Sequence, residues 1–119
     1  MNPFKNKNVM ITGHTGFKGS WLTAWLHMLG ANITAVSKDV PTIPAHYDLL
    51  KSFIQNDITA DITKYSQIHT IIKDCKPNYI FHLAAQPIVL TSYEDPYLTF
   101  QSNSIGTLNI LESLRIINP

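Results

Sequence analysis

The 119-residue chain lacks several features that mark other protein classes. Its single cysteine, Cys75, has no partner for an intramolecular disulfide and no spaced Cys or His companions for a zinc site. No apolar run approaches the length of a membrane span, and the apolar stretch near the N-terminus breaks too early for a signal peptide. We therefore expect a soluble cytoplasmic protein with no metal site and no membrane partner.

The chain also lacks an excess of charge of either sign. Nine Lys and Arg nearly balance eight Asp and Glu, which gives a net charge of +1, and the charges are mixed along the chain. A nucleic-acid binder would carry a basic patch or stripe, so we expect no nucleic-acid partner. The length allows one domain, residues 1–119, with a core of its own.

Glycine is scarce, but three of the five glycines lie within seven residues. An apolar run, residues 9–11, precedes this segment and a helical pattern, residues 20–29, follows it. A glycine-rich turn between a strand and a helix lets the backbone approach a pyrophosphate, and the free N–H groups and dipole of the helix favour the anion. The turn predicts a bound dinucleotide, the alternative being a tight turn without ligand, and its residues are Gly13, His14, Thr15, Gly16, Phe17, Lys18 and Gly19.

Strand-like and helix-like segments alternate along the rest of the chain. We expect strands at residues 9–12, 32–36, 52–54 and 79–83, and helices at residues 20–29, 62–75 and 95–118. Alternation of this kind predicts an α/β fold: a Rossmann-like parallel sheet with helices on both faces. Right-handed crossovers give the strand order 3-2-1-4, with the glycine turn at the carboxyl edge where the order reverses.

The helix periodicity also predicts which side chains pack inside. In the first helix the apolar positions are Leu22, Trp25, Leu26 and Leu29, and we interpret Trp21 and Trp25 as packing residues rather than ligand platforms. In the last helix successive turns are marked by Ile105, Leu108, Leu111 or Glu112, and Ile116.

Residues at the carboxyl ends of the other strands are expected to line the same pocket. Strand two ends in Ser37-Lys38-Asp39, which offers both charges, so NAD and NADP stay open as alternatives. Asp61 is placed either to accept a hydrogen bond from adenine or to cap the next helix, and both roles are compatible. After strand four come the small Ala84 and Ala85 and the amide of Gln86.

Two residues near the glycine turn carry open alternatives, and a third has a structural interpretation. Lys18, at the positive end of a helix dipole, either meets a bound phosphate or is solvated. Thr15 either donates its hydroxyl to the same phosphates or caps the helix before Gly16. Asn103 is a poor helix former in a predicted helix, and we interpret it as an anchor for a neighbouring strand's backbone.

Several motifs span nearly the whole chain: residues 13–22, residues 82–87, Ser92-Tyr93 followed by Pro96, and Asn103 with Gly106-Thr107 and Leu111-Glu112. With these motifs the chain resembles the N-terminal part of an extended short-chain dehydrogenase/reductase, and within that family the CDP-glucose 4,6-dehydratases. Phe17-Lys18 is the sharpest discriminator, because related dehydratases and epimerases usually carry an aliphatic residue in place of Lys18.

The resemblance implies an NAD-dependent lyase of deoxysugar and lipopolysaccharide biosynthesis. In that family NAD oxidises C4 of the sugar, water leaves from C6, and the hydride returns to C6. It implies a nucleotide-sugar partner, a last helix able to join a homodimer's helical bundle, and substrate contacts at Gln86, Ser92 and Tyr93. The implied cofactor contacts are the turn 13–19 together with Ser37, Asp61, Ile62, Leu83, Ala84, Ala85 and Gln86.

The chain also departs from the family pattern. Leu90 stands where an arginine is common, and the family's later Tyr-x-x-x-Lys helix and substrate region are missing. Tyr47 and Lys51 have the right spacing but precede strand three, on the adenosine side, so we assign no catalytic residue. We expect a truncated chain, inactive in isolation. The alternatives are a stand-alone dinucleotide-binding module and another sugar-nucleotide dehydratase or epimerase of the extended family.

Overall fold

A four-stranded parallel sheet forms the centre of the molecule. The structure is a computed structural model that describes residues 1–118. Its strands are β1 (Asn8–Thr12), β2 (Asn32–Ser37), β3 (Asn56–Thr59) and β4 (Tyr79–His82), in the spatial order β3-β2-β1-β4. The predicted order 3-2-1-4 is therefore confirmed, and β1 lies between β2 and β4 with the glycine turn at its carboxyl end.

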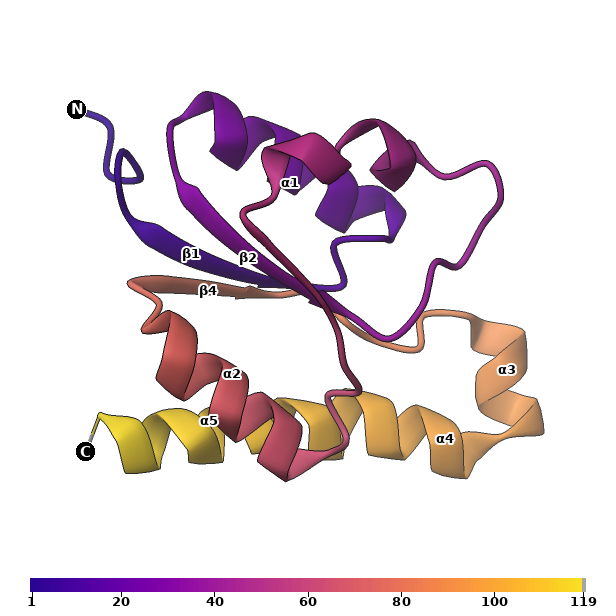
Figure 1. Cartoon of the computed structure of the whole chain (residues 1–119). Coiled ribbons are helices and arrows are strands. Elements are labelled where there is room, and N and C mark those ends of the chain that lie inside the picture. The colour runs from indigo at the N-terminus through magenta and orange to yellow at the C-terminus, as the bar shows by residue number, and fades with distance from the viewer. Residues whose placement is uncertain (119) are drawn as a thin grey trace.

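Helices cover both faces of this sheet (Figure 1). One face carries α1 (Phe17–Met28) and two short 3-10 helices, η1 (His46–Leu49) and η2 (Lys51–Phe53). The opposite face carries α2 (Tyr65–Cys75) and α5 (Gly106–Ile117), which pack side by side. Between β4 and α5 the chain forms α3 (Val89–Glu94), α4 (Pro96–Phe100) and the π-helical segment η3 (Gln101–Ile105).

The sheet separates two apolar clusters because its central strands are buried on both sides. Alternate residues of β1 point to opposite faces, so Val9 and Ile11 pack beneath α1 while Met10 packs against α2 and α5. Leu26 of α1 joins the first cluster, and Ile110 of α5 joins the second. This double burial explains the continuous apolar run that the sequence shows there.

The third strand lies later in the chain than predicted. The segment 52–54 was expected to be the strand, but Lys51–Phe53 forms the 3-10 helix η2, and β3 is the polar segment Asn56–Thr59. An edge strand can face solvent with most of its side chains, and here only Ile58 is partly buried against the core. Strand prediction from apolar runs therefore selected the wrong residues.

The face that α1 turns toward the sheet also differs from the prediction. Its buried positions are Gly19, Ser20, Thr23 and Leu26, whereas Trp21 and Trp25 are 56% and 65% exposed. Small residues let α1 approach the sheet closely, which turns both indoles outward. The two tryptophans were interpreted as packing residues, but neither packs in the core; Trp21 instead stacks on His46, with ring centroids 4.3 Å apart.

The predicted last helix is present but is interrupted and rotated. Asp95 caps α4 by accepting from the Leu98 N–H at 2.9 Å, and η3 then shifts the phase of the helix before α5. The buried positions of α5 are Gly106, Asn109, Ile110 and Ser113, so the predicted Leu108, Leu111 and Ile116 are exposed. The helix α3 was not predicted. Within residues 1–118, no helix combines the length and apolar character that crossing a membrane requires.

Candidate functional site

The glycine turn joins β1 to α1 and lies directly against the segment that follows β4. Gly13 has φ +79°, a conformation that side chains rarely adopt, and a Cβ there would lie 2.7 Å from the Ala84 nitrogen. A Cβ on Gly19 would overlap the Gly13 carbonyl. Both positions need glycine for packing, whereas a Cβ on Gly16 would meet only the Gly13 carbonyl oxygen, at 3.4 Å.

Gly16 is the N-cap of α1, and this end of the helix is open. In the described part of the chain, no side chain caps the first turn of α1 and no acidic residue lies in it. The first N–H groups of a helix have no intrahelical acceptor, so they are available to an anion. Phe17 and Lys18 are both exposed at this end. Thr15 does not cap the helix: no N–H of the first turn bonds to a side chain, and the Thr15 hydroxyl donates to the Asp39 carbonyl at 2.7 Å.

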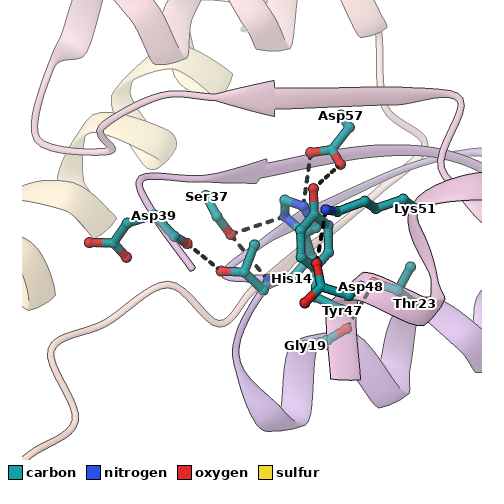
Figure 2. A network of polar contacts seen from close by, with 10 residues as sticks. His14, Gly19, Thr23, Ser37, Asp39, Tyr47, Asp48, Lys51 and Asp57 are labelled. Atoms are coloured by element: carbon teal, nitrogen blue, oxygen red, sulfur yellow. Dashed lines mark hydrogen bonds and ion pairs between the residues drawn. The ribbon is translucent and has the colours of Figure 1, made fainter. Parts of the chain in front are cut away.

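A polar network lies beneath the turn (Figure 2). The His14 side chain is 1% exposed; its Nε2 lies 3.0 Å from Asp57 Oδ1 and its Nδ1 lies 3.0 Å from Ser37 Oγ. Asp57 Oδ2 accepts from the Tyr47 hydroxyl at 2.6 Å. Because a carboxylate only accepts, His14 carries its proton on Nε2 and accepts at Nδ1 from Ser37. The imidazole of His14 is thus fully occupied inside the protein, and only the His14 backbone faces the turn.

The Tyr47 environment is unlike that of an acid-base tyrosine. Burial and the Asp57 carboxylate raise the pKa of Tyr47 to about 12, whereas an acid-base tyrosine needs a lowered pKa. Lys51 Nζ lies 5.0 Å from the Tyr47 ring centroid, above the ring rather than beside the hydroxyl. In this geometry Lys51 does not lower the pKa of Tyr47.

Lys38 and Asp39, which follow β2 and leave the choice of cofactor open in the sequence, point to different places. Lys38 Nζ points to Asp61 Oδ2, 3.7 Å away, whereas Ser37 and Asp39 line a small cavity of about 60 Å³ at the carboxyl ends of β1, β2 and β3. His14, Tyr47, Asp57 and Thr59 line the same cavity, and its lining contains no Lys or Arg. The cavity therefore presents hydroxyl and carboxylate oxygens.

Asp61 and Ile62 follow β3 and have different surroundings. Asp61 accepts from the Thr63 N–H and hydroxyl at 2.9 and 2.8 Å, and these bonds with Lys38 hold its pKa below the usual range despite partial burial. It does not cap α2, whose N-cap is Lys64. The Ile62 side chain is buried against Gly106 in the core, and its backbone carbonyl accepts from Asn109 Nδ2 at 2.9 Å.

The segment Leu83 to Gln86 follows β4 and is held by side chains from elsewhere in the chain. Asn103 accepts from the Gln86 N–H at 2.7 Å and donates to the Gln86 carbonyl at 3.0 Å, which matches its interpretation as a backbone anchor. The Gln86 side chain donates to Thr99 Oγ1 and the Ile88 carbonyl and accepts from the Ile88 N–H. Gln86 is therefore committed to shaping the loop.

The expected substrate residues Ser92 and Tyr93 lie on α3, beyond the carboxyl end of β4 (Figure 1). The Ser92 hydroxyl donates to the Val89 carbonyl at 2.6 Å, and Tyr93 is 81% exposed. Leu90, which replaces the common arginine, is also exposed. These residues share the carboxyl side of the sheet with the glycine turn.

Asp57 was missed by the sequence reasoning although it lies at the centre of the network. It joins His14 to Tyr47 across 43 and 10 residues of sequence. The only available signal was an acidic residue in a polar segment near a sheet edge, and the misplaced third strand hid that signal.

The chain matches a protein family and has curated relatives. A family model described as GDP-mannose 4,6 dehydratase matches residues 10–119. The chain is 38% identical to a CDP-glucose 4,6-dehydratase of Salmonella typhimurium over 115 residues, which covers 96% of this chain and 32% of that protein. It thus spans about a third of the length of the curated relatives that it matches.

Solved structures share the same architecture. A UDP-glucose 4-epimerase of Thermotoga maritima superimposes with a TM-score of 0.82 at 27% identity, over 93% of this chain and 35% of that one. A UDP-glucose 4-epimerase of Thermus thermophilus in complex with NAD gives a TM-score of 0.76 at 26% identity, over 92% and 34%. With the family model matched across almost the whole sequence, the chain belongs to the GDP-mannose 4,6-dehydratase family.

Proposed function

We propose that this chain is the NAD-binding part of a sugar-nucleotide 4,6-dehydratase that acts on CDP-glucose. The observation that carries the proposal is the glycine turn: Gly13 and Gly19 bring the backbone close to the loop after β4, and Gly16 leaves the first turn of α1 open. This arrangement fits a pyrophosphate at the N-terminus of the helix. NAD in the solved relative from Thermus thermophilus supports the choice of ligand.

The cofactor contacts that we propose come mostly from backbone. Gly13 to Gly19 would hold the pyrophosphate, Ser37 the adenosine ribose, Asp61 and Ile62 the adenine side, and Leu83 to Gln86 the nicotinamide side. Lys18 would add a cation at the phosphates, since its side chain is exposed beside the open helix end. The His14 contact is restricted to its backbone because its ring is bonded to Asp57 and Ser37.

We further propose that NAD is preferred over NADP. Asp39 lies beside the cavity at the end of β2 with its carboxylate on the solvent side (Figure 2), and Lys38 is turned to Asp61. A carboxylate there accepts hydrogen bonds from ribose hydroxyls and repels a 2′-phosphate. Calorimetry with both cofactors tests this: NAD should bind at least about tenfold more tightly, and Asp39→Arg should narrow or reverse the ratio. Equal affinity for both in the parent chain would contradict it.

The substrate assignment rests on the similarity to the Salmonella typhimurium CDP-glucose 4,6-dehydratase. In the whole enzyme, bound NAD would supply the hydride acceptor for C4. The C5 proton and the C6 hydroxyl would then leave together as water, and the hydride and a proton would return to C6 and C5. Gln86, Ser92 and Tyr93 are the residues of this chain that we place beside the substrate, Gln86 through the loop that it shapes. We propose that this chain alone does not turn over CDP-glucose, because its only Tyr-x-x-x-Lys spacing is the Tyr47 to Lys51 pair described above.

Incubation of the purified chain with CDP-glucose and NAD tests the last statement. The expected result is no 4-keto-6-deoxy product, whose formation would overturn it.

A second candidate function, a stand-alone dinucleotide-binding module, is favoured by the completeness of the core. The sheet is covered on both faces, and each face has its own buried cluster. Cooperative thermal unfolding together with micromolar NAD affinity would support the module. A chain that folds only with additional polypeptide would argue against it.

A further inference from the structure

A row of hydrogen-bonded side chains joins β1, β4 and α5 below the loop that follows β4. Thr12 is the last residue of β1, His82 the last of β4, and Thr107 lies in the first turn of α5. Thr12 Oγ1 lies 2.6 Å from His82 Nδ1, and His82 Nε2 lies 3.0 Å from Thr107 Oγ1. The imidazole thus bridges two threonines that are 95 residues apart in sequence.

The direction of each hydrogen bond follows from the neighbouring bonds. The Thr107 hydroxyl donates to the Asn103 carbonyl at 2.7 Å, so its oxygen can only accept from His82 Nε2–H. A neutral imidazole protonated on Nε2 accepts at Nδ1, so the Thr12 hydroxyl donates there. Thr12 Oγ1 in turn accepts from the Ala84 N–H at 3.2 Å. Each donor in this row of side chains therefore meets an acceptor.

The two ends of this row of side chains hold the same short loop. Ala84 is bonded to Thr12, and Gln86 is bonded through its backbone N–H and carbonyl to the Asn103 side chain. The hydrogen bonds therefore close a ring that runs from Ala84 through the imidazole to Asn103 and back to Gln86. Asn103 belongs to η3, and π-helical segments of this kind often occur at functional sites.

The surroundings of His82 favour the neutral form that this ring requires. Thr12 is fully buried and His82 is half-buried. Burial lowers the pKa of His82, and no charged group contributes to that shift among the described residues. Protonation would replace the acceptor at Nδ1 by a donor and break the bond that the Thr12 hydroxyl makes.

We propose that His82 is a positioning residue that fixes the Ala84 to Gln86 loop against the glycine turn by joining Thr12 to Thr107. The close approach of Gly13 to Ala84 makes the loop's place critical, since a single added Cβ would lie 2.7 Å from the Ala84 nitrogen. That the loop faces a dinucleotide rests on the proposed function above, whereas the ring itself does not.

Nitrogen-15 NMR of the imidazole in the full chain, without cofactor, tests the ring directly. At about pH 7.5 the spectrum should show a neutral ring with its proton on Nε2 and an acceptor at Nδ1. A proton on Nδ1, or a charged imidazolium, would overturn the proposal. This measurement needs no variant and does not depend on NAD.

Amide hydrogen exchange of two threonine variants tests the effect on the loop. Thr107→Val removes the hydroxyl oxygen that accepts the hydrogen bond from His82 Nε2–H. Amide exchange at Ala84 and Gln86 should then rise about tenfold, as expected for loss of one hydrogen bond. Thr70→Val is the matched control, because Thr70 makes the same hydroxyl bond to a helix carbonyl, that of Ser66, outside the ring. Unchanged exchange at Ala84 and Gln86 in a folded Thr107→Val chain would contradict the proposal.

Titration of the same variants with NAD separates this proposal from the proposed function. Weaker NAD binding in Thr107→Val than in Thr70→Val supports both. Equal binding with faster loop exchange keeps the ring but overturns its role toward the cofactor. If the folded parent chain does not bind NAD, the proposed function is overturned. The exchange and NMR results then decide whether the hydrogen-bonded ring exists.

Discussion

Gly13 is the residue on which the geometry of the turn depends most. Its positive φ and its contact with the Ala84 backbone leave no room for a side chain, and the neighbour is backbone that cannot move aside cheaply. Gly16 is different, since its Cβ would meet only one carbonyl oxygen at an ordinary distance. The two glycines thus separate a packing role from a ligand-facing role.

We expect Gly13→Ala to lower the free energy of unfolding by about 1–3 kcal/mol, because it combines strain at positive φ with a backbone clash. Gly16→Ala should leave stability within about 0.5 kcal/mol of the parent and weaken NAD binding instead. Urea denaturation and calorimetry measure the two effects. The reverse pattern would contradict the assignment of the two roles.

The buried ring of His14 makes stability depend on pH. Burial lowers the pKa of His14 more than Asp57 raises it, so the folded state disfavours the charged ring that the unfolded chain forms below its ordinary pKa. The groups that face it are Asp57, Ser37 and Tyr47. The free energy of unfolding should therefore fall as pH decreases below about 6.5, and flatten once the folded state also binds the proton.

Denaturation between about pH 7.5 and pH 5 measures this dependence, and His14→Gln should reduce its slope. His82 has a pKa lowered by burial in the same direction, so some slope should remain in that variant. His69→Gln, a change at a partly exposed position on α2, serves as the control. A slope unchanged in His14→Gln would contradict the account.

At the scale of elements, the α5 helix docks through small and polar residues. Gly106 packs against the Ile62 side chain, where a Cβ would lie 2.5 Å from Ile62 Cδ1, and Asn109 donates to the Ile62 carbonyl at 2.9 Å. Apolar periodicity cannot detect such a face. The same limit applies to α1, which approaches the sheet through Gly19, Ser20 and Thr23.

Gly106→Ala should therefore destabilise the chain by about 1–3 kcal/mol, with the lower end reached if Ile62 changes rotamer. Leu108→Ala, on the exposed side of the same helix, should change stability by less than about 0.5 kcal/mol despite removing a larger apolar group. Urea midpoints at a constant m-value give both numbers. A larger loss of stability in Leu108→Ala than in Gly106→Ala would instead support the buried face predicted from periodicity.

The order of the sheet was predictable because it follows from strand-helix alternation and crossover handedness, which do not depend on exact boundaries. The position of β3 was not, because an edge strand needs no apolar run. The glycine turn was predictable because a local backbone requirement selects its residues. The roles of His14 and Asp57 were not, since they arise from contacts between three elements that sequence order does not bring together.

At the scale of the whole molecule, apolar side chains remain exposed along α1 and α5. On α5 these include Leu108 and Leu111, each more than half exposed, and within residues 1–118 β4 pairs on one side only, with β1. Exposed apolar surface and an unpaired strand edge both promote association. We expect the chain to self-associate.

Sedimentation velocity of the parent chain and of Leu111→Lys measures this association. The parent should sediment with a concentration-dependent coefficient, and the charged substitution on α5 should weaken the dependence. The control is Val89→Lys on α3, an exposed apolar residue on a different element. A parent chain that stays monomeric at every concentration would contradict the expectation.

Binding of the dinucleotide at the glycine turn underlies every proposal about the cofactor. Amide NMR shifts on titration with NAD measure it, because they locate even weak binding on the sequence. We expect the largest changes at Gly13 to Gly19 and at Ala84 to Gln86, with small changes at the amino ends of the strands. A folded chain whose turn amides do not move in the presence of NAD would contradict it.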